Sequence, residues 1–339
     1  PHGIKMWCLG NEMDGPWQIG HKTAEEYGRI AAETGRAMRM MDPELLLVAC
    51  GSSGRAMPTF GEWERVVLQE AWDQIDMVSA HSYYAERDGN LAEFLVCAED
   101  MDRFITSLSA TIDAAATARK STKKIGISFD EWNVWYQQRA ESKLPSGDEW
   151  PVAPPLLEDR YSVADAVVVG DLLITLLRHT DRVWAANQAQ LVNVIAPIMT
   201  EPGGSAWKQT IFHPFALTSK HARGEVLRLT VNSPVVHSQQ FGPVQAVDAV
   251  ATRDSAAGEL VLFLVNRSTD DAVDAAIAVP ASFERLVEAL TYHASDPYWQ
   301  ASKDDQSLVP EWNDSAQLAR DVVQVQLPPV SWSMIRLAR

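Results

Sequence analysis

Short apolar segments alternate with helical patterns over roughly the first two thirds of the chain, and this alternation limits the possible folds more than any other feature. The apolar segments are hydrophobic on both faces, as parallel strands covered by helices are. Strand and helix in regular succession predict an α/β fold with a parallel sheet and right-handed crossovers. The predicted strands are Ile4–Leu9, Leu45–Cys50, Ile75–Ala80, Lys124–Phe129 and Arg182–Ala186. The predicted helices are Thr23–Met41, Glu62–Trp72, Leu91–Arg119 and Ser162–Arg178.

The start and the end of the first predicted helix are both marked in the sequence. Thr23 and Glu26 form a capping box, in which each side chain accepts a hydrogen bond from a backbone N–H group at the helix start. Asp42-Pro43 ends the helix, because proline disfavours a helical conformation in the residue before it. By themselves, five such strands fit either a doubly wound sheet or the last five strands of an eight-stranded barrel.

After residue 216 the pattern changes to short strands separated by turn residues, which predicts an antiparallel β-sandwich. We therefore expect two domains, 1–217 and 218–339. The segment Tyr136–Asp159 is too long for a simple connection, and such loops often serve as lids or binding loops. The predicted strands of the second domain are Glu225–Asn232, Val244–Thr252, Glu259–Asn266, Ala272–Val279, Arg285–Tyr292 and Asp321–Leu337.

The composition excludes several classes of partner. A net charge of −16 disfavours nucleic acid and anionic membranes through like-charge repulsion. A neutral carbohydrate meets no such barrier, and the 12 tryptophans could supply sugar-binding surfaces. Three widely spaced cysteines indicate neither a disulfide framework nor a metal site, and Cys8 and Cys50 are expected to be buried thiols. No apolar stretch is long enough to predict a membrane span.

Two glutamates follow predicted strands directly. Glu12 comes after Ile4–Leu9, and Glu131 comes after Lys124–Phe129. Ligands bind at the carboxyl ends of parallel strands, so both side chains are expected at the same rim. Cleavage of a glycosidic bond needs such a pair, with one acid to protonate the leaving oxygen and one carboxylate to attack carbon or activate water. A separation of roughly 5 Å makes the second carboxylate a nucleophile, and the anomeric configuration is then retained.

The segments around these glutamates resemble those of a known family. Gly10–Gln18 reads G-N-E-M-D-G-P-W-Q and Asp130–Tyr136 reads D-E-W-N-V-W-Y, and both are similar to the signature segments of the α-L-arabinofuranosidases of glycoside hydrolase family 51. The resemblance implies that Glu12 is the acid/base at the end of barrel strand 4 and that Glu131 is the nucleophile at the end of strand 7. The chain would then hold strands 4 to 8 of a (β/α)8 TIM barrel, followed by a jelly-roll-like sandwich.

The resemblance also implies roles for residues outside the two glutamates. Asn11 would bind the sugar 2-hydroxyl, and Tyr83 would donate to Glu131 and stabilise its ionised form. His81 would lie near the carboxylates. The remaining residues implied to bind the sugar are Trp135 and Gln188, with Trp17 at the rim of the pocket. The charge of Glu131 is expected to raise the proton affinity of Glu12.

Other polar positions are expected to play supporting roles. Asp14 is interpreted as structuring its loop, and Asp130 as a buried partner within the site. Gly51–Gly54 lacks the Lys-Ser/Thr of a phosphate-binding loop. No histidine, cysteine and carboxylate pattern has the spacing of a metal site, and the expected mechanism needs no cofactor.

The expected activity is retaining, exo-acting removal of terminal α-L-arabinofuranosyl residues from arabinan or arabinoxylan oligosaccharides or polysaccharides. The alternatives are an endoglucanase or β-xylosidase on the same scaffold, and a non-catalytic carbohydrate-binding fragment. We expect a homo-oligomer in the cytoplasm, with secretion left open. The barrel needs three further strands, expected before Pro1, so the 339 residues alone are expected to be inactive or poorly folded.

Overall fold

The computed structural model describes residues 2–148 and 150–339, and these form two compact units. The first unit contains the residues up to Tyr83 together with Asp100–Trp132 and His179–Ala189. The second contains Tyr84–Glu99, Asn133–Arg178 and Gln190–Arg339.

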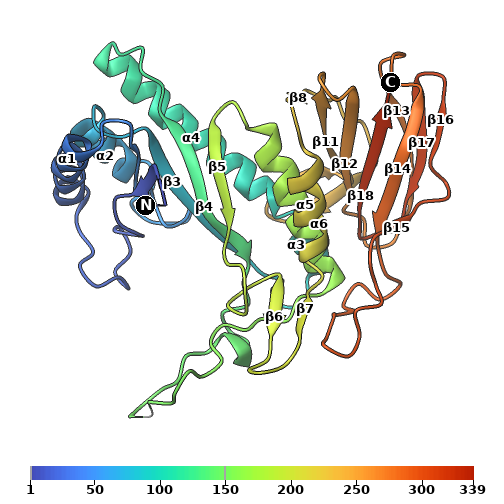
Figure 1. Cartoon of the computed structure of the whole chain (residues 1–339), viewed down its shortest axis with the longest axis horizontal. Helices are drawn as coiled ribbons and strands as arrows, with labels where there is room; N and C mark the ends of the chain where they lie inside the picture. The colour runs from blue at the N-terminus through green and yellow to red at the C-terminus, as the bar shows by residue number, and fades with distance from the viewer. Residues whose placement is uncertain (1, 149) are drawn as a thin grey trace. The chain divides into compact units, whose positions relative to one another are not determined.

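A five-stranded sheet in the sequential order β1-β2-β3-β4-β5 confirms the predicted α/β pattern (Figure 1). Strand β1 pairs in parallel with β2, β2 with β3, and β4 with β5. This order is that of consecutive βα units in a barrel, so the sheet corresponds to part of one. The strands are β1 (Met6–Cys8), β2 (Leu46–Ala49), β3 (Met77–Tyr84), β4 (Gly126–Val134) and β5 (Val183–Gln188).

Strand β4 is longer than predicted, so Glu131 lies inside the strand instead of beyond it. Its register against β5 shifts between Phe129 and Trp132. Such a bulge bends a strand and turns a side chain away from the regular alternation. The two residues that follow Phe129, Asp130 and Glu131, are therefore presented from an irregular part of the strand.

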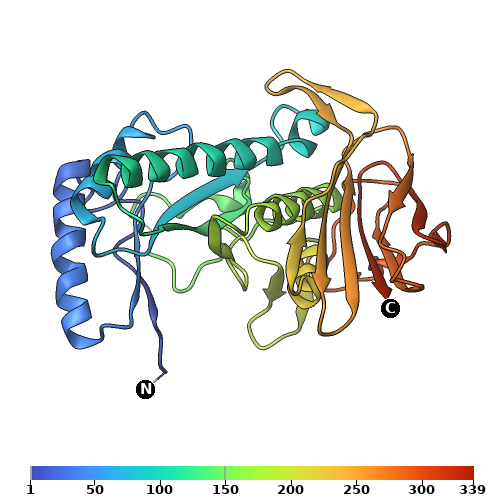
Figure 2. The ribbon, with the colours of Figure 1, turned by 90° about the horizontal axis from the view of Figure 1, so that it is seen from above.

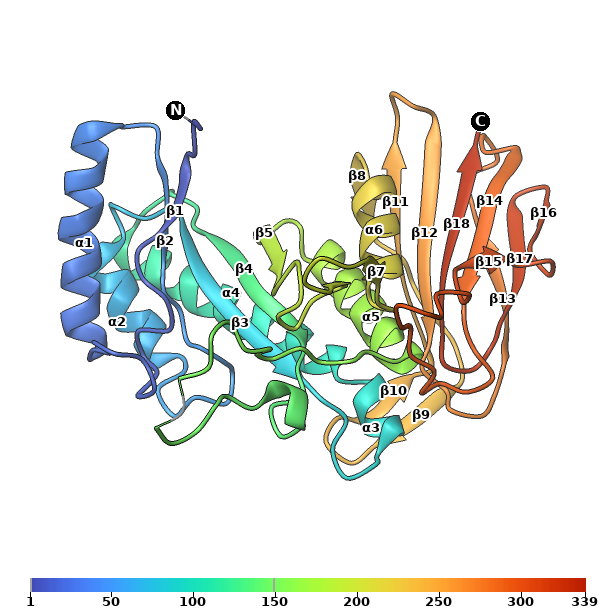
Figure 3. The ribbon, with the colours of Figure 1, turned by 60° about the horizontal axis from the view of Figure 1, so that its bottom comes forward.

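Helices pack against this sheet through apolar contacts. Figure 2 shows α4 (Ala98–Arg119) running along the sheet, where the ring of Phe104 meets that of Phe129 on β4 at 5.8 Å. Helices α1 (Ala24–Met41) and α2 (Glu62–Ala71) lie side by side (Figure 3), with Tyr27 stacked on Trp63. The predicted capping box of α1 is confirmed, since Thr23 and Glu26 exchange both hydrogen bonds.

The prediction of a single helix over Leu91–Arg119 is wrong. The structure has a short helix, α3 (Leu91–Leu95), and then α4. The N–H groups of Val96 and Cys97 both donate to the carbonyl oxygen of Phe94, so the last turn closes too tightly to continue as an α-helix. Apolar residues are buried on both sides of the break, which is why the sequence pattern ran through it.

The antiparallel part of the second unit is a β-sandwich, as predicted. A six-stranded sheet has the order β15-β14-β18-β12-β11-β8 and a three-stranded sheet the order β13-β17-β16, and both contribute side chains to one apolar core. The strands are β8 (Glu225–Leu227), β11 (Val247–Asp254), β12 (Glu259–Asn266), β13 (Val273–Ala278), β14 (Arg285–Tyr292), β15 (Glu311–Trp312), β16 (Gln317–Ala319), β17 (Val322–Leu327) and β18 (Ser331–Ala338).

The other face of the large sheet is covered by α5 (Val163–Arg178) and α6 (Phe212–His221), as Figures 1 and 3 show. A side chain at Gly170 of α5 would come within 2.1 Å of Trp332 on β18, so this close approach requires a glycine. Strand β12 is therefore buried along nearly its whole length. The expected boundary at 217/218 falls inside α6 and stays a prediction.

Several predicted sandwich strands have different bounds in the structure. Asp321–Leu337 is two strands, β17 and β18, because Pro328 and Pro329 lack the N–H groups that a ladder needs. Val244–Thr252 is also divided, into β10 (Gly242–Gln245) and β11, and Glu225–Asn232 shortens to β8. The remaining elements are the strands β6 (Ile198–Thr200), β7 (Ala206–Lys208) and β9 (Val235–Ser238) and the 3-10 helix η1 (Ala140–Ser142).

The long loop 136–159 is fixed at its two ends by a buried carboxylate. Asp159 accepts a 2.6 Å hydrogen bond from the N–H group of Tyr136 and another from the hydroxyl of Ser142. The phenol of Tyr136 donates to Asp165 of α5 at 2.6 Å. A role of this loop as a lid stays a prediction. Among the described residues, no helix has the length and apolar character needed to cross a membrane.

Candidate active site

Glu12 is held in a turn that follows β1. Gly10 has a φ of +111° and Glu12 a φ of +47°, and the carbonyl oxygen of Glu12 accepts a 2.9 Å hydrogen bond from the N–H group of Gly15. A positive φ is uncommon for a residue with a side chain and costs free energy. The turn therefore fixes the direction of the Glu12 side chain at the expense of local strain.

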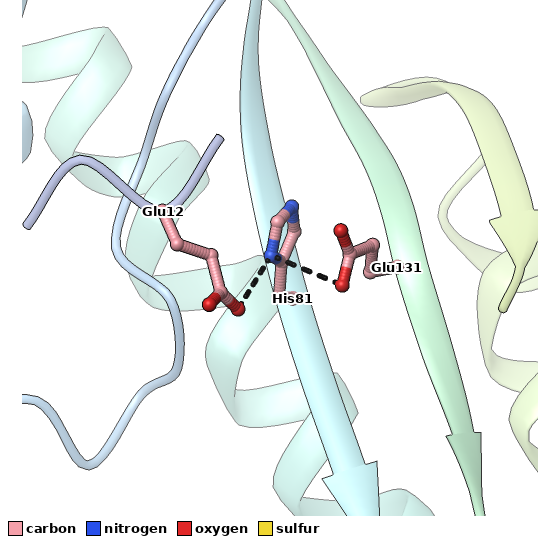
Figure 4. Close-up of side chains that lie close together, drawn as sticks. All are labelled: Glu12, His81 and Glu131. Atoms are coloured by element: carbon pink, nitrogen blue, oxygen red, sulfur yellow. Dashed lines mark hydrogen bonds and ion pairs between the residues drawn. The ribbon is translucent and has the colours of Figure 1, made fainter. Parts of the chain in front are cut away.

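The two glutamates predicted to act together lie close together in the structure. One carboxylate oxygen of Glu12, one of Glu131 and a ring nitrogen of His81 are all within 4.8 Å of one another. Figure 4 shows the imidazole of His81 between the two carboxylates, which come from the turn after β1 and from β4. Retaining glycosidases have carboxyl groups about 5–5.5 Å apart, whereas inverting enzymes need about 6.5–9.5 Å. The approach of one oxygen of each carboxylate to within 4.8 Å is consistent with the shorter of these separations.

His81 on β3 is buried and faces carboxylates with both ring nitrogens. Nδ1 lies 3.1 Å from Oε1 of Glu12 and 3.7 Å from Oε2 of Glu131, and Nε2 lies 3.0 Å from Oδ1 of Asp130. Burial lowers the pKa of His81, but the hydrogen bonds to Asp130 and Glu12 and the charge of Glu131 raise it to about 10. The imidazole is therefore a cation at neutral pH, and it donates from both nitrogens.

Asp130 supports this histidine, in agreement with its predicted role as a buried partner. Its Oδ2 atom accepts a 3.1 Å hydrogen bond from the hydroxyl of Ser128 and a 3.4 Å contact from the thiol of Cys8. Its other oxygen is thus left to His81. The sequence offered no signal for the contributions of Ser128 and Cys8, because both depend on which side chains converge at the sheet edge.

Glu12 is surrounded by hydrogen-bond donors. Nε1 of Trp17 donates to Oε2 of Glu12 at 2.6 Å, and Nε2 of Gln18 lies 3.5 Å from the same oxygen. Burial raises the pKa of Glu12, but the hydrogen bonds from His81 and Trp17 lower it more, so it lies below its ordinary value. The expected increase in proton affinity is therefore absent from the unliganded site, where the hydrogen-bond donors outweigh the effect of burial.

Tyr83 occupies the position expected for the tyrosine beside the second glutamate. Its hydroxyl donates a 2.8 Å hydrogen bond to Oε2 of Glu131. Burial, together with the charge of Glu131, raises the pKa of Tyr83, so the phenol keeps its proton and remains a donor. This bond orients the carboxylate of Glu131.

A cavity of about 160 Å³ opens among these side chains. Cys50 is buried as expected, but Cys8 is exposed, because β1 forms an edge of the sheet. Burial of its sulfur atom and nearby carboxylates raise the pKa of Cys8 to about 12. The same two causes raise the pKa of Cys50 to about 11, although a hydrogen bond from Tyr27 lowers it. Both thiols are therefore protonated. The cavity is lined by Cys8, Gly10, Asn11, Val48, Cys50, Ser79, His81, Asp130 and Glu131.

The other predicted site residues do not all lie at the cavity. Asn11 lines the cavity, and Gln188 ends β5 opposite Trp132 of β4. Trp17 is more than half exposed and contacts Glu12 directly. Trp135 belongs to the second unit, so its role in sugar binding stays a prediction.

Asp14 structures its loop, as expected. Its carboxylate accepts hydrogen bonds from the N–H group and the hydroxyl of Ser53.

Two glutamates and a histidine at this spacing could in principle bind a metal ion. An imidazole binds a metal through an unprotonated nitrogen. In the structure both ring nitrogens of His81 are engaged by carboxylate oxygens, Nδ1 by Glu12 and Nε2 by Asp130. We therefore describe the three residues as a hydrogen-bonded network.

The chain is similar to known arabinofuranosidases. Residues 130–331 match the family model described as the α-L-arabinofuranosidase C-terminal domain. The chain is 50% identical over 340 residues to an intracellular exo-α-(1→5)-L-arabinofuranosidase of Streptomyces lividans, covering 100% of this chain and 51% of that protein. It is also 50% identical over 348 residues to an exo-α-(1→6)-L-arabinofuranosidase of Bifidobacterium longum, covering 99% of this chain and 66% of that protein.

A solved structure shows the same fold. The structure of a family 51 α-L-arabinofuranosidase from Bifidobacterium longum superposes with a TM-score of 0.94 at 43% identity, covering 99% of this chain and 68% of that one. The chain therefore spans between about half and two thirds of the length of these relatives.

Proposed function

The chain belongs to the α-L-arabinofuranosidases of family 51, and from this premise we propose that it carries the catalytic pair of a retaining, exo-acting α-L-arabinofuranosidase. The proposal rests on the approach of one carboxylate oxygen of Glu12 and one of Glu131 to within 4.8 Å. Glu12 lies in the turn after β1 and Glu131 in β4, three strands farther along the same parallel sheet. This spacing leaves room for direct attack on the anomeric carbon but not for an interposed water.

The proposed reaction is a double displacement. Glu131 attacks the anomeric carbon while Glu12 protonates the departing glycosidic oxygen, which forms a covalent arabinofuranosyl-enzyme. Glu12 then removes a proton from water, and the water oxygen displaces Glu131. Two inversions return the original anomeric configuration. No step in this scheme requires a cofactor.

Sugar binding is assigned to residues around the cavity. Asn11 would hydrogen-bond the 2-hydroxyl of the arabinofuranosyl ring, a contact that strengthens as the transition state forms. Gln188 and Trp135 are proposed to contact the same ring, and Tyr83 to position the nucleophile. The exo-acting relatives named above support action on terminal residues.

The proposed substrates are oligosaccharides or polysaccharides with terminal arabinofuranosyl groups, of the arabinan or arabinoxylan type. The two relatives above are named for α-(1→5) and α-(1→6) linkages. The name of the Streptomyces relative also places it inside the cell, which supports a cytoplasmic location for this protein. We further propose a homo-oligomer, as expected from the family resemblance.

A panel of 4-nitrophenyl glycosides tests the proposed activity on the protein as its gene encodes it. We expect turnover of the α-L-arabinofuranoside to exceed that of the β-D-xyloside and β-D-glucoside, and Glu131→Ala to abolish it. Proton NMR of the first product should show the α-anomer before mutarotation. Preference for the xyloside or glucoside would contradict the substrate, and a β-anomer would contradict retention. Sugar binding without turnover of any substrate would indicate a non-catalytic binding protein.

A further inference from the structure

The proposed acid of this site lacks its proton in the unliganded state. The donors around Glu12 are the indole of Trp17, the amide of Gln18 and the imidazole of His81, and each reaches a carboxylate oxygen. A carboxylate that accepts from every neighbour is stabilised in its ionised form. General acid catalysis requires the protonated form of Glu12, so a proton must reach it before the glycosidic bond breaks.

Among the donors that contact Glu12, only His81 can carry an acidic proton. A neutral imidazole has one N–H group, whereas both nitrogens of His81 lie within 3.1 Å of carboxylate oxygens, which can only accept. With both carboxylates ionised, only the doubly protonated ring satisfies both contacts, whereas a protonated Glu12 would itself donate to Nδ1 of a neutral ring. One of its protons therefore lies on Nδ1, at hydrogen-bond distance from Oε1 of Glu12.

We propose, as an extension of the proposed glycosidase function, that His81 stores the catalytic proton and passes it from Nδ1 to Oε1 of Glu12 when the sugar binds. The Nδ1–H bond breaks and an O–H bond forms on Glu12, while the electron pair stays on Nδ1 and the imidazole becomes neutral. Its second proton remains on Nε2 and is donated to Asp130. No other proton source is needed, and the net charge of the network does not change.

Sugar binding favours this transfer for two reasons. The side chain of Glu12 is 15% exposed, so a bound sugar removes water from it and disfavours its charged form. The leaving oxygen approaches Glu12 from the side of Oε2, to which Trp17 donates. Rotation of the carboxyl group then brings the proton received on Oε1 to that side, so the proton from His81 reaches the leaving oxygen. Because Trp17 is 57% exposed, the leaving group can displace the indole, and Glu12 then loses a bond that stabilised its charge.

The groups that face His81 come from several elements. Glu12 reaches it from the turn after β1, Asp130 and Glu131 from β4, and Tyr83 lies two residues farther along β3. Cys8 and Cys50 line the same cavity. Burial and nearby charges raise the pKa of Tyr83 and of both thiols, so these groups remain neutral. The mobile proton is therefore shared among one imidazole and the carboxylates around it.

The pH dependence of kcat/KM separates this proposal from a purely electrostatic role of His81. A proton store keeps a proton available at high pH, so His81→Gln should move the alkaline limb to lower pH by at least one unit. A fixed cation would instead depress the proton affinity of Glu12, and its removal would move that limb to higher pH. A limb that moves to higher pH, or stays in place, overturns the proposal.

Asp130→Asn provides a second variant with almost unchanged shape. Since the neutral amide holds the imidazolium less strongly than a carboxylate does, the alkaline limb should move in the same direction as in His81→Gln. Glu33→Gln, on the exposed face of α1, is the matched control for the loss of one negative charge and should leave the profile unchanged. Thermal unfolding curves establish that each variant is folded.

The protonation state of His81 can also be measured without turnover. Nitrogen-15 NMR of the unliganded protein at pH 7.5 should show two protonated ring nitrogens for His81. A neutral ring at this pH overturns the proposal, whatever the activity. A doubly protonated ring in a protein that hydrolyses no arabinofuranoside instead contradicts the proposed function and leaves the protonation of the site intact.

Discussion

Tyr83 on β3 donates a hydrogen bond of 2.8 Å to Oε2 of Glu131 on the neighbouring strand β4. The bond orients the proposed nucleophile, and Tyr83 remains a donor because its raised pKa keeps the phenol protonated. Tyr83→Phe removes the donor while keeping the ring. A hydrogen bond to a charged group contributes about 1.5–3 kcal/mol, so we expect kcat/KM to fall by about 10- to 100-fold.

Tyr298→Phe is the matched control for this change, because it removes a 2.9 Å hydrogen bond between a tyrosine and the carboxylate of Glu86 elsewhere in the chain. Steady-state kinetics on an aryl α-L-arabinofuranoside should show the decrease for Tyr83→Phe alone. Equal kinetics for the two variants would remove Tyr83 from the positioning of the nucleophile.

Glu12→Ala should separate substrates by their leaving groups. A dinitrophenolate leaves without a proton, so formation of the glycosyl-enzyme should be nearly normal, whereas an alkyl or sugar leaving group should react about 10²- to 10⁴-fold more slowly. Azide fits the space left by the carboxylate and should restore turnover of the intermediate, giving an arabinofuranosyl azide. Equal losses on good and poor leaving groups would refute the assignment of Glu12 as the acid.

The order of strands, and the two glutamates at one edge of the sheet, could be predicted because they depend on local patterns. Apolar runs locate the strands, and parallel order places their carboxyl ends together. Glu131 and Tyr83 were expected to meet for this reason, and their side chains do. The break between α3 and α4 could not be predicted, since buried apolar residues occur on both sides of it, at Leu95, Val96 and Ala98.

The protonation state of the site cannot be predicted from sequence patterns. It depends on an imidazole reached by Glu12 from one element and by Asp130 from another, over distances of about 3 Å. Sequence position predicts that such residues are neighbours but not which nitrogen faces which oxygen. The lowered pKa of Glu12 has the same origin, because it follows from the directions of the Trp17 and His81 donors.

The stability of the protein should depend on pH through His81. Its pKa is about 10 in the folded state, above the value of about 6.5 in an unfolded chain, so the folded state binds this proton more tightly. The contribution of His81 to the free energy of unfolding is on the order of 3–5 kcal/mol. It is fully present below pH 6.5 and is lost as the pH rises towards 10. Denaturant unfolding across this range should show the decrease in the unmodified protein and a flatter profile in His81→Gln. His237→Gln, at an exposed position on β9, should keep the slope.

Arg267 should be far more important for stability than a surface arginine. It follows β12, is 2% exposed, and contacts Asp171 of α5 at 2.8 Å, Asp248 of β11 at 2.7 Å and Glu99 at 3.0 Å. Replacing it with methionine leaves Asp171 buried without its counter-ion, while Asp248 keeps only its ion pair with Arg178. Removing one partner of a buried ion pair costs about 3–5 kcal/mol, because the remaining charge keeps its desolvation penalty.

Arg253→Met provides the comparison, since the 2.7 Å ion pair of Arg253 with Glu225 is substantially exposed. Such surface pairs contribute about 0–1 kcal/mol. Denaturant unfolding at pH 7 should show a large decrease in the midpoint for Arg267→Met and a small one for Arg253→Met. At pH 4 the difference should narrow, because protonation removes the unpaired charges that destabilise Arg267→Met. The two variants could instead differ little in midpoint at pH 7, or the difference in midpoint could fail to narrow at pH 4. Either result would mean that water reaches these carboxylates and that α5 is held against the sandwich by its apolar contacts alone.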